Sequence, residues 1–104
     1  MKVKRNENGS YKIEGAMYIY IEIGYITEDK KCYELRVTSI DEPRRRADKN
    51  FYKKYRSDRI FYTEKLEELK MFLAKYETEK DLLFDYYTAR LEGKYELDFY
   101  GTRR

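Results

Sequence analysis

The chain has 104 residues, 41% of them charged, and a formal net charge of only +3. This length suits one domain with a single core, and the charge balance is typical of a solvated surface rather than of a strong polyanion binder. The lack of histidine and the single cysteine exclude histidine-based catalysis, a zinc site and an internal disulfide within this chain. No apolar run approaches the roughly 18 residues of a membrane span, so we expect one soluble, cytoplasmic domain over residues 1–104.

The clearest strand pattern lies near the N-terminus. Residues 1–8 are polar, and we expect them to be flexible. Ser10–Glu14 predicts a short strand, which Gly15 turns into the stretch Ala16–Ile26. Isoleucines alternate there with tyrosine and glutamate, which is the two-residue period of a strand with one aliphatic face. We interpret Ala16–Ile26 as the central strand of a sheet.

The next segment predicts a hairpin partner for that strand. In Cys32–Ile40, apolar residues alternate with polar ones after a short charged connection. The pattern therefore predicts a three-strand meander over Ser10–Ile40. We expect Glu22 to form a cross-strand ion pair with Arg36, and Cys32 to be a half-buried strand residue.

A basic connector occupies residues 41–59. From Pro43 to Arg59 there are eight basic side chains against two acidic ones. Pro43 ends the preceding strand because it lacks a backbone donor. Ala47–Tyr55 then forms either a short helix or an ordered loop.

The following stretch predicts helices. Arg59–Tyr62 is a possible short strand, and Thr63 is a candidate N-cap. Leu66, Leu69, Leu73 and Tyr76 then recur at helical spacing.

The sequence TEKD, Thr78–Asp81, resembles a capping box, which favours a second helix over a continuation of the first. We expect Leu83, Tyr87 and Leu91 to line the inner face of this second helix, and Gly93 to end it.

The last element predicted is a strand over Lys94–Tyr100, where apolar and acidic residues alternate. The sequence therefore predicts an α+β domain: an antiparallel sheet of three to five strands that begins as a meander, one or two helices packed on one face, and a C-terminal strand.

Tyrosine is unusually frequent, with 13 residues and no tryptophan. We expect about half of the tyrosines to serve as core aromatics, including Tyr25, Tyr87 and Tyr95. Tyr18, Tyr20 and Tyr33 are candidates for an exposed aromatic patch, because tyrosine buries a large area in protein interfaces at small entropic cost.

The basic connector also interleaves cations with aromatic rings. Such a surface fits either phosphates and bases or an acidic surface on another protein. A solvated loop with no binding role is the remaining interpretation. The candidate binding residues are Arg44, Arg45, Arg46, Lys49, Tyr52, Lys53, Lys54, Tyr55 and Arg56.

Carboxylates gather in the helical part of the sequence. Most have a lysine within four residues, which indicates a solvated face rather than a metal or catalytic site. In one variant of the binding hypothesis these carboxylates imitate phosphates; they are Glu64, Glu67, Glu68, Glu77, Glu79 and Asp81. We predict no catalytic residue, no metal site and no cofactor.

In its small size, its richness in charge, lysine, glutamate and tyrosine, and its lack of enzyme motifs, the chain resembles the small phage and mobile-element proteins that include anti-CRISPR inhibitors. The resemblance implies a protein that occupies a nucleic-acid-binding surface of a host enzyme. We therefore expect a non-enzymatic protein that docks on a nucleic-acid-handling protein, such as a host defence nuclease, and inhibits or modulates it.

The alternative is direct DNA or RNA binding through residues 44–59, as a regulator or a single-strand binder. An enzyme using tyrosine, lysine or glutamate is a third and weaker hypothesis. The chain is expected to be a monomer or a homodimer, and the sequence does not say which strand lies at a sheet edge.

Overall fold

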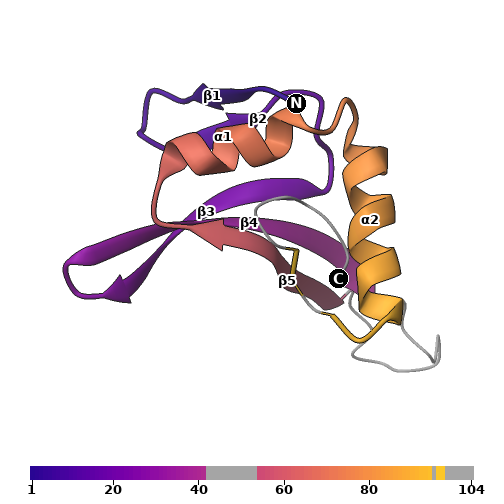
Figure 1. Ribbon diagram of the computed structural model, residues 1–104. Helices are drawn as coiled ribbons and strands as arrows, with labels where there is room; N and C mark the ends of the chain where they lie inside the picture. The colour runs from indigo at the N-terminus through magenta and orange to yellow at the C-terminus, as the bar shows by residue number, and fades with distance from the viewer. Residues whose placement is uncertain (42–53, 95, 98–104) are drawn as a thin grey trace, which may run out of the picture.

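The computed structural model of the protein describes residues 1–41, 54–94 and 96–97, and these form an α+β fold with antiparallel strands (Figure 1). Within this part of the chain, neither helix is long and apolar enough to cross a membrane. The elements are β1 (Val3–Arg5), β2 (Tyr11–Ile13), β3 (Ile19–Thr27), β4 (Lys30–Asp41), β5 (Lys54–Thr63), α1 (Leu66–Ala74) and α2 (Glu79–Leu91).

The larger sheet has three strands in the order β3-β4-β5. The predicted hairpin is confirmed, because β3 and β4 pair antiparallel from Ile19 opposite Val37 onward. The central strand is β4, however, and β3 lies at an edge. The third strand is β5, which begins at Lys54 and is therefore much longer than the segment Arg59–Tyr62 predicted from the sequence. A helix reaching Tyr55 is wrong, since the backbone of Tyr55 pairs with Ile40.

The N-terminal residues form a second, two-stranded sheet. We expected Ser10–Glu14 to pair with the next strand and residues 1–8 to be flexible, but β2 pairs with β1 instead, with Val3 opposite Ile13. The Met1 nitrogen also donates hydrogen bonds to the carbonyl oxygens of Leu73 (2.8 Å) and Tyr76 (2.5 Å), so the start of the chain is held against the end of α1. The sequence did not predict this sheet, because its strands have only three residues each and few apolar side chains.

The core lies between the larger sheet, α1, α2 and the two-stranded sheet. Phe61 of β5 stacks on Phe72 of α1 with ring centroids 4.3 Å apart and nearly parallel planes. Ile19 and Ile21 of β3 are buried, as the alternation predicted. Tyr25, expected in the core, is 68% exposed because β3 runs past the helices into a projecting hairpin.

Helix α1 begins later than its predicted cap. Its N-cap is Lys65, which has no side-chain capping bond. Thr63 instead accepts a hydrogen bond from the Lys65 backbone nitrogen (3.2 Å) and donates one to Glu68 (2.6 Å). The threonine therefore stabilises the turn before the helix.

The second helix is confirmed as a separate element. The Thr78 hydroxyl accepts a hydrogen bond from the Asp81 backbone nitrogen at 3.2 Å, which is the capping interaction predicted for TEKD. At the other end Gly93 has φ +84°, and Lys94 donates to the Ala89 carbonyl oxygen at 2.9 Å. These contacts form a glycine-terminated helix end.

The inner face of α2 differs from the prediction by one residue. Leu82, Tyr86 and Ala89 are buried, whereas Tyr87 and Leu91 point to solvent. Both sets have helical spacing, so periodicity alone does not distinguish them.

The predicted C-terminal strand is not confirmed. Tyr95 and residues 98–100 lie outside the described residues, and Glu96 and Leu97 are not in a strand. The Leu97 nitrogen nevertheless donates a hydrogen bond of 2.7 Å to the carbonyl oxygen of Ile60 in β5. Ile60 is the extra residue of a β-bulge, where Leu35 faces Phe61 but Arg36 faces Arg59.

Candidate interaction surfaces

The predicted basic site lies mostly outside the residues that the structure describes. This holds for Arg44, Arg45, Arg46, Lys49, Tyr52 and Lys53. The backbones of Lys54, Tyr55 and Arg56 lie in β5, where Lys54 pairs with Asp41 at the end of β4. The basic connector therefore joins two neighbouring antiparallel strands.

The outer face of the larger sheet, opposite the core, carries a network of arginines and carboxylates. Glu34 of β4 bridges two arginines: its carboxylate oxygens lie 3.2 Å from Arg36 Nη1 and 3.1 Å from Arg59 Nη1. Arg36 Nε also lies 3.5 Å from Glu22, which confirms the predicted cross-strand pair. The guanidinium of Arg36 further donates to the hydroxyl and carbonyl oxygens of Ser57.

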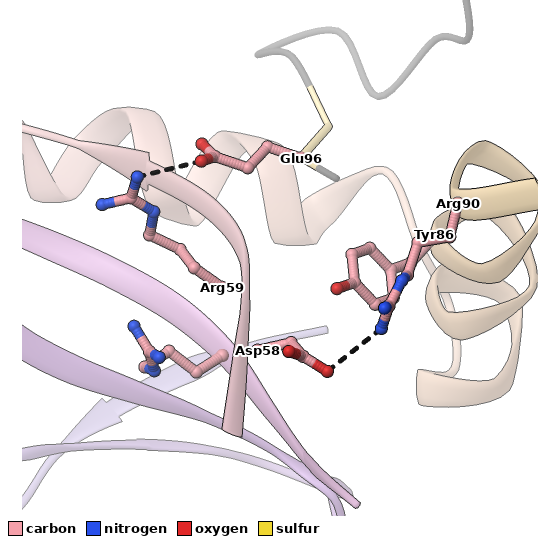
Figure 2. A pocket seen from close by; sticks show the side chains of 6 residues that line it. Asp58, Arg59, Tyr86, Arg90 and Glu96 are labelled. Carbon is pink, nitrogen blue, oxygen red and sulfur yellow. Dashed lines mark hydrogen bonds and ion pairs between the residues drawn. The ribbon is translucent and has the colours of Figure 1, made fainter. Parts of the chain in front are cut away.

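The C-terminal segment adds a further carboxylate. Glu96 accepts a hydrogen bond of 2.9 Å from Arg59 Nη2 (Figure 2). This bond with Glu96, together with the pair to Glu34, raises the pKa of Arg59 above its ordinary value, although burial acts in the opposite direction. Arg59 is thus held between the sheet and the segment that follows α2.

A pocket of about 300 Å³ lies beside this network, between β5 and α2. On its α2 side, Arg90 Nη1 lies 3.1 Å from Asp58 Oδ2. Burial lowers the pKa of Arg90, but its interactions with Tyr86 and Asp58 outweigh that effect and raise it. Burial also raises the pKa of the Tyr86 hydroxyl. The pocket is lined by Arg36, Asp58, Arg59, Tyr86, Arg90 and Glu96.

The arginines of this pocket are matched by carboxylates. Arg59 pairs with two glutamates, Arg36 with two and Arg90 with one aspartate. A phosphate entering the pocket would have to displace these partners and would meet the remaining negative charge. The network therefore stabilises the junction of sheet, α2 and C-terminal segment better than it would bind an anion.

The three tyrosines of the predicted patch do not share one surface. Tyr20 lies on the outer face, where its hydroxyl contacts Ser57 Oγ, and Tyr18 is exposed just before β3. Tyr33 lies opposite Ile23 on the aliphatic face and packs edge-on against Tyr11, with ring centroids 5.9 Å apart.

An exposed apolar stripe runs along the outer side of α2. Its members are Phe84, 69% exposed, Tyr87 and Leu91, 89% exposed. They recur at spacings of three and four residues, so they lie along one side of the helix. The prediction assigned Tyr87 and Leu91 to the core, so sequence reasoning missed this surface. The sequence does contain a sign of this surface. Apolar residues lie on two sides of α2, and only one side can be buried against the core.

The acidic side chains proposed as phosphate mimics are largely engaged within the molecule. Glu64 pairs with Lys30 (3.1 Å), Glu67 with Lys70 (3.7 Å), and Glu68 accepts from Thr63. These contacts reduce the charge available to imitate a nucleic acid backbone.

Glu79, at the start of α2, is the most strongly bound of these carboxylates. It accepts hydrogen bonds from three successive backbone nitrogens: Met17 (3.0 Å), Tyr18 (2.8 Å) and Ile19 (2.8 Å). The carboxylate therefore fastens α2 to the first residue of β3.

Among residues 1–41, 54–94 and 96–97, no group of three or more metal-ligating side chains is arranged to hold a metal ion. No protein-family model, curated protein or solved structure matches this chain.

Proposed function

We propose that this chain is a non-enzymatic binding protein that docks on a nucleic-acid-handling protein and inhibits or modulates it. The observation that supports a protein partner best is the exposed stripe of Phe84, Tyr87 and Leu91 on α2. Large apolar side chains in a row are costly in water, and they are typical of protein interfaces rather than of phosphate contacts.

The basic connector supports the second half of the proposal. Its strand end, Lys54, precedes Asp58 in β5, and Asp58 contacts Arg90 in the last turn of α2. The start of β5 at Lys54 and the C-terminal end of α2 therefore lie at the same end of the sheet (Figure 1). A partner that offers an apolar groove beside an acidic or phosphate-shaped surface would contact both.

Direct nucleic acid binding is the rival function. It would not rest on the arginines of the described sheet face, because these are paired with carboxylates. Affinity that depends on neutralised phosphates falls steeply with salt, so the two functions predict different salt responses.

The test is binding measured with two variants. We expect capture of a partner from host lysate to be lost when Arg44, Arg45 and Arg46 are changed together to alanine, and also in Phe84→Ser/Leu91→Ser. The matched control is Met71→Ser, which alters an exposed apolar residue on α1. Capture should survive nuclease treatment of the lysate.

A salt titration with fluorescent single- and double-stranded DNA and RNA distinguishes the rival. Tight binding with a steep salt dependence, unaffected by Phe84→Ser/Leu91→Ser, would overturn the proposal in favour of direct nucleic acid binding.

A further inference from the structure

The two edge strands of the larger sheet, β5 and β3, differ in the hydrogen bonds that they receive from other parts of the chain. At the β5 edge, the Leu97 nitrogen donates a hydrogen bond to the Ile60 carbonyl oxygen, so Leu97 lies beside that strand. At the β3 edge, the Glu79 carboxylate binds the nitrogens of Met17, Tyr18 and Ile19, but its contacts stop there.

Beyond Ile19, every second residue of β3 directs its backbone groups away from β4. The Thr38 nitrogen donates to the Tyr18 carbonyl oxygen. Because hydrogen-bonded pairs alternate in an antiparallel ladder, Tyr20, Glu22 and Gly24 direct their backbone groups toward β4. The odd-numbered residues Ile21, Ile23 and Tyr25 therefore direct theirs outward. No described residue outside β4 makes a backbone hydrogen bond to them.

The sequence of β3 has few of the residues that usually prevent pairing at a strand edge. The nine residues of β3 contain one charged residue, Glu22, and neither lysine nor proline. Long apolar edges of this kind pair with another strand unless charge, proline or a covering element blocks them. The strand β2 lies close to β3 in the core, but Figure 1 shows that the tip of the β3–β4 hairpin projects past α1 and the two-stranded sheet, where Tyr25 is 68% exposed.

We propose that β3 pairs antiparallel with β3 of a second copy of this chain, with Ile23 on the two-fold axis, to form a continuous six-stranded sheet. The residues that would face each other favour this register. Ile23 faces Ile23 of the second copy, Ile21 faces Tyr25, and Glu22 faces Gly24. All outward backbone groups of Ile21, Ile23 and Tyr25 are then paired, and the exposed Tyr25 is covered on the aliphatic side.

The neighbouring registers are disfavoured. A two-fold axis at Glu22 would set two carboxylates directly opposite each other, where like charges destabilise the pair. An axis at Ile21 would pair Ile23 with Ile19, whose nitrogen is already bonded to Glu79. Glycine at position 24 removes any side chain that would meet Glu22.

The first test is the mass of the purified chain by sedimentation equilibrium over a wide concentration range. We expect a reversible monomer–dimer equilibrium. Tyr25→Lys should weaken it by about tenfold or more, because the change adds charge to the edge without touching the core. Met71→Lys is the control, since it introduces the same charge at an exposed apolar site on α1 and should leave the dimer intact.

Cysteine crosslinking tests the register. In a Cys32→Ala background, which removes the buried native thiol, Ile23→Cys should form an intermolecular disulfide under mild oxidation. Directly paired residues lie about 5.5 Å apart at Cα, within the range a disulfide spans. Glu22→Cys and Met71→Cys should crosslink much more slowly.

A mass that stays monomeric at every concentration would overturn the proposal, as would a dimer that Tyr25→Lys leaves unchanged. Faster crosslinking by Glu22→Cys than by Ile23→Cys would overturn the register. Circular dichroism of each variant establishes that it retains the monomer fold.

Discussion

Among the residues that the structure describes, Glu79 has the side chain whose hydrogen bonds join the most distant parts of the sequence. Its carboxylate gathers three successive N–H groups at the start of β3, at 2.8–3.0 Å. Those donors would otherwise need water, because Met17 and Tyr18 precede the β3–β4 ladder and Ile19 directs its nitrogen away from β4. The charge also lies in the first turn of α2, where the helix dipole favours it.

We predict that Glu79→Gln lowers the free energy of unfolding by about 1–2 kcal/mol, because an amide offers one acceptor oxygen in place of two charged ones. Urea unfolding followed by circular dichroism measures the change. Glu67→Gln is the matched control on α1, since Glu67 is highly exposed and makes only a 3.7 Å pair with Lys70. Equal stability of the two variants would show that the Glu79 contacts contribute little.

The buried hydroxyl of Tyr86 makes the stability of the protein depend on pH in the alkaline range. Burial raises the pKa of its hydroxyl above the ordinary value of 10.0. Above pH 10 the unfolded chain therefore releases the tyrosine proton before the folded chain does, and stability falls as pH rises through the folded pKa. We predict that Tyr86→Phe reduces this loss. Thermal unfolding between pH 8 and about pH 11 measures it, and parallel curves for the two proteins would contradict the prediction.

At the scale of the element, α2 has two apolar sides with different partners. Leu82, Tyr86 and Ala89 are buried against the sheet, whereas Phe84, Tyr87 and Leu91 are exposed. Polar contacts fix both ends of the helix, through Glu79 at its start and the Arg90–Asp58 pair in its last turn. The outer stripe is therefore held in one orientation before any partner binds, which lowers the entropic cost of docking.

The same leucine-to-alanine change should have very different effects on stability on the two sides of α2. Leu82→Ala should destabilise the protein by about 2–5 kcal/mol, because it leaves a cavity in the core. Leu91→Ala should change stability by less than about 0.5 kcal/mol, because the side chain is already in water. Thermal denaturation of both variants measures the difference, and a comparable loss in Leu91→Ala would place that residue in the core.

The sequence predicts the elements of this fold better than their partners. Alternation identified β3 and β4, and capping residues identified the start of α2 and its end at Gly93. Pairing was harder. The turn between β1 and β2 contains Asn8-Gly9, which is typical of hairpins, but β1 has only three residues and one apolar side chain, Val3, so its alternation is too short to recognise. The inner face of α2 was misassigned by one residue because Leu82 and Leu83 fit the helical period equally well.

The candidate surfaces were less predictable than the fold. The Glu22–Arg36 pair followed from strand alternation, since the two residues share one face. The contacts of Arg59 with Glu96 and of Glu79 with β3 join residues far apart in the chain. Such contacts depend on tertiary packing, which composition and periodicity do not determine. The basic connector stays a prediction, because most of it lies outside the described residues.

At the scale of the whole molecule, the two sheets share one core. Ile13 of the two-stranded sheet is buried in the same cluster as Leu35 of β4 and Phe72 of α1. We therefore predict a single cooperative unfolding transition. Ile13→Ala should lower the free energy of unfolding by about 2–5 kcal/mol. The denaturant midpoint should fall by the same amount whether unfolding is followed by circular dichroism or by tyrosine fluorescence. Transitions that separate in the variant would mean that the two-stranded sheet unfolds on its own.

The bulge at Ile60 has a consequence for exchange spectroscopy. Because the extra residue leaves its carbonyl oxygen outside the β4–β5 ladder, that oxygen is available to the Leu97 amide. The Leu97 proton can exchange with deuterated solvent only when this contact opens. Its protection factor therefore reports the free energy of detaching Leu97 from β5, separately from the global opening that core amides such as that of Leu35 report.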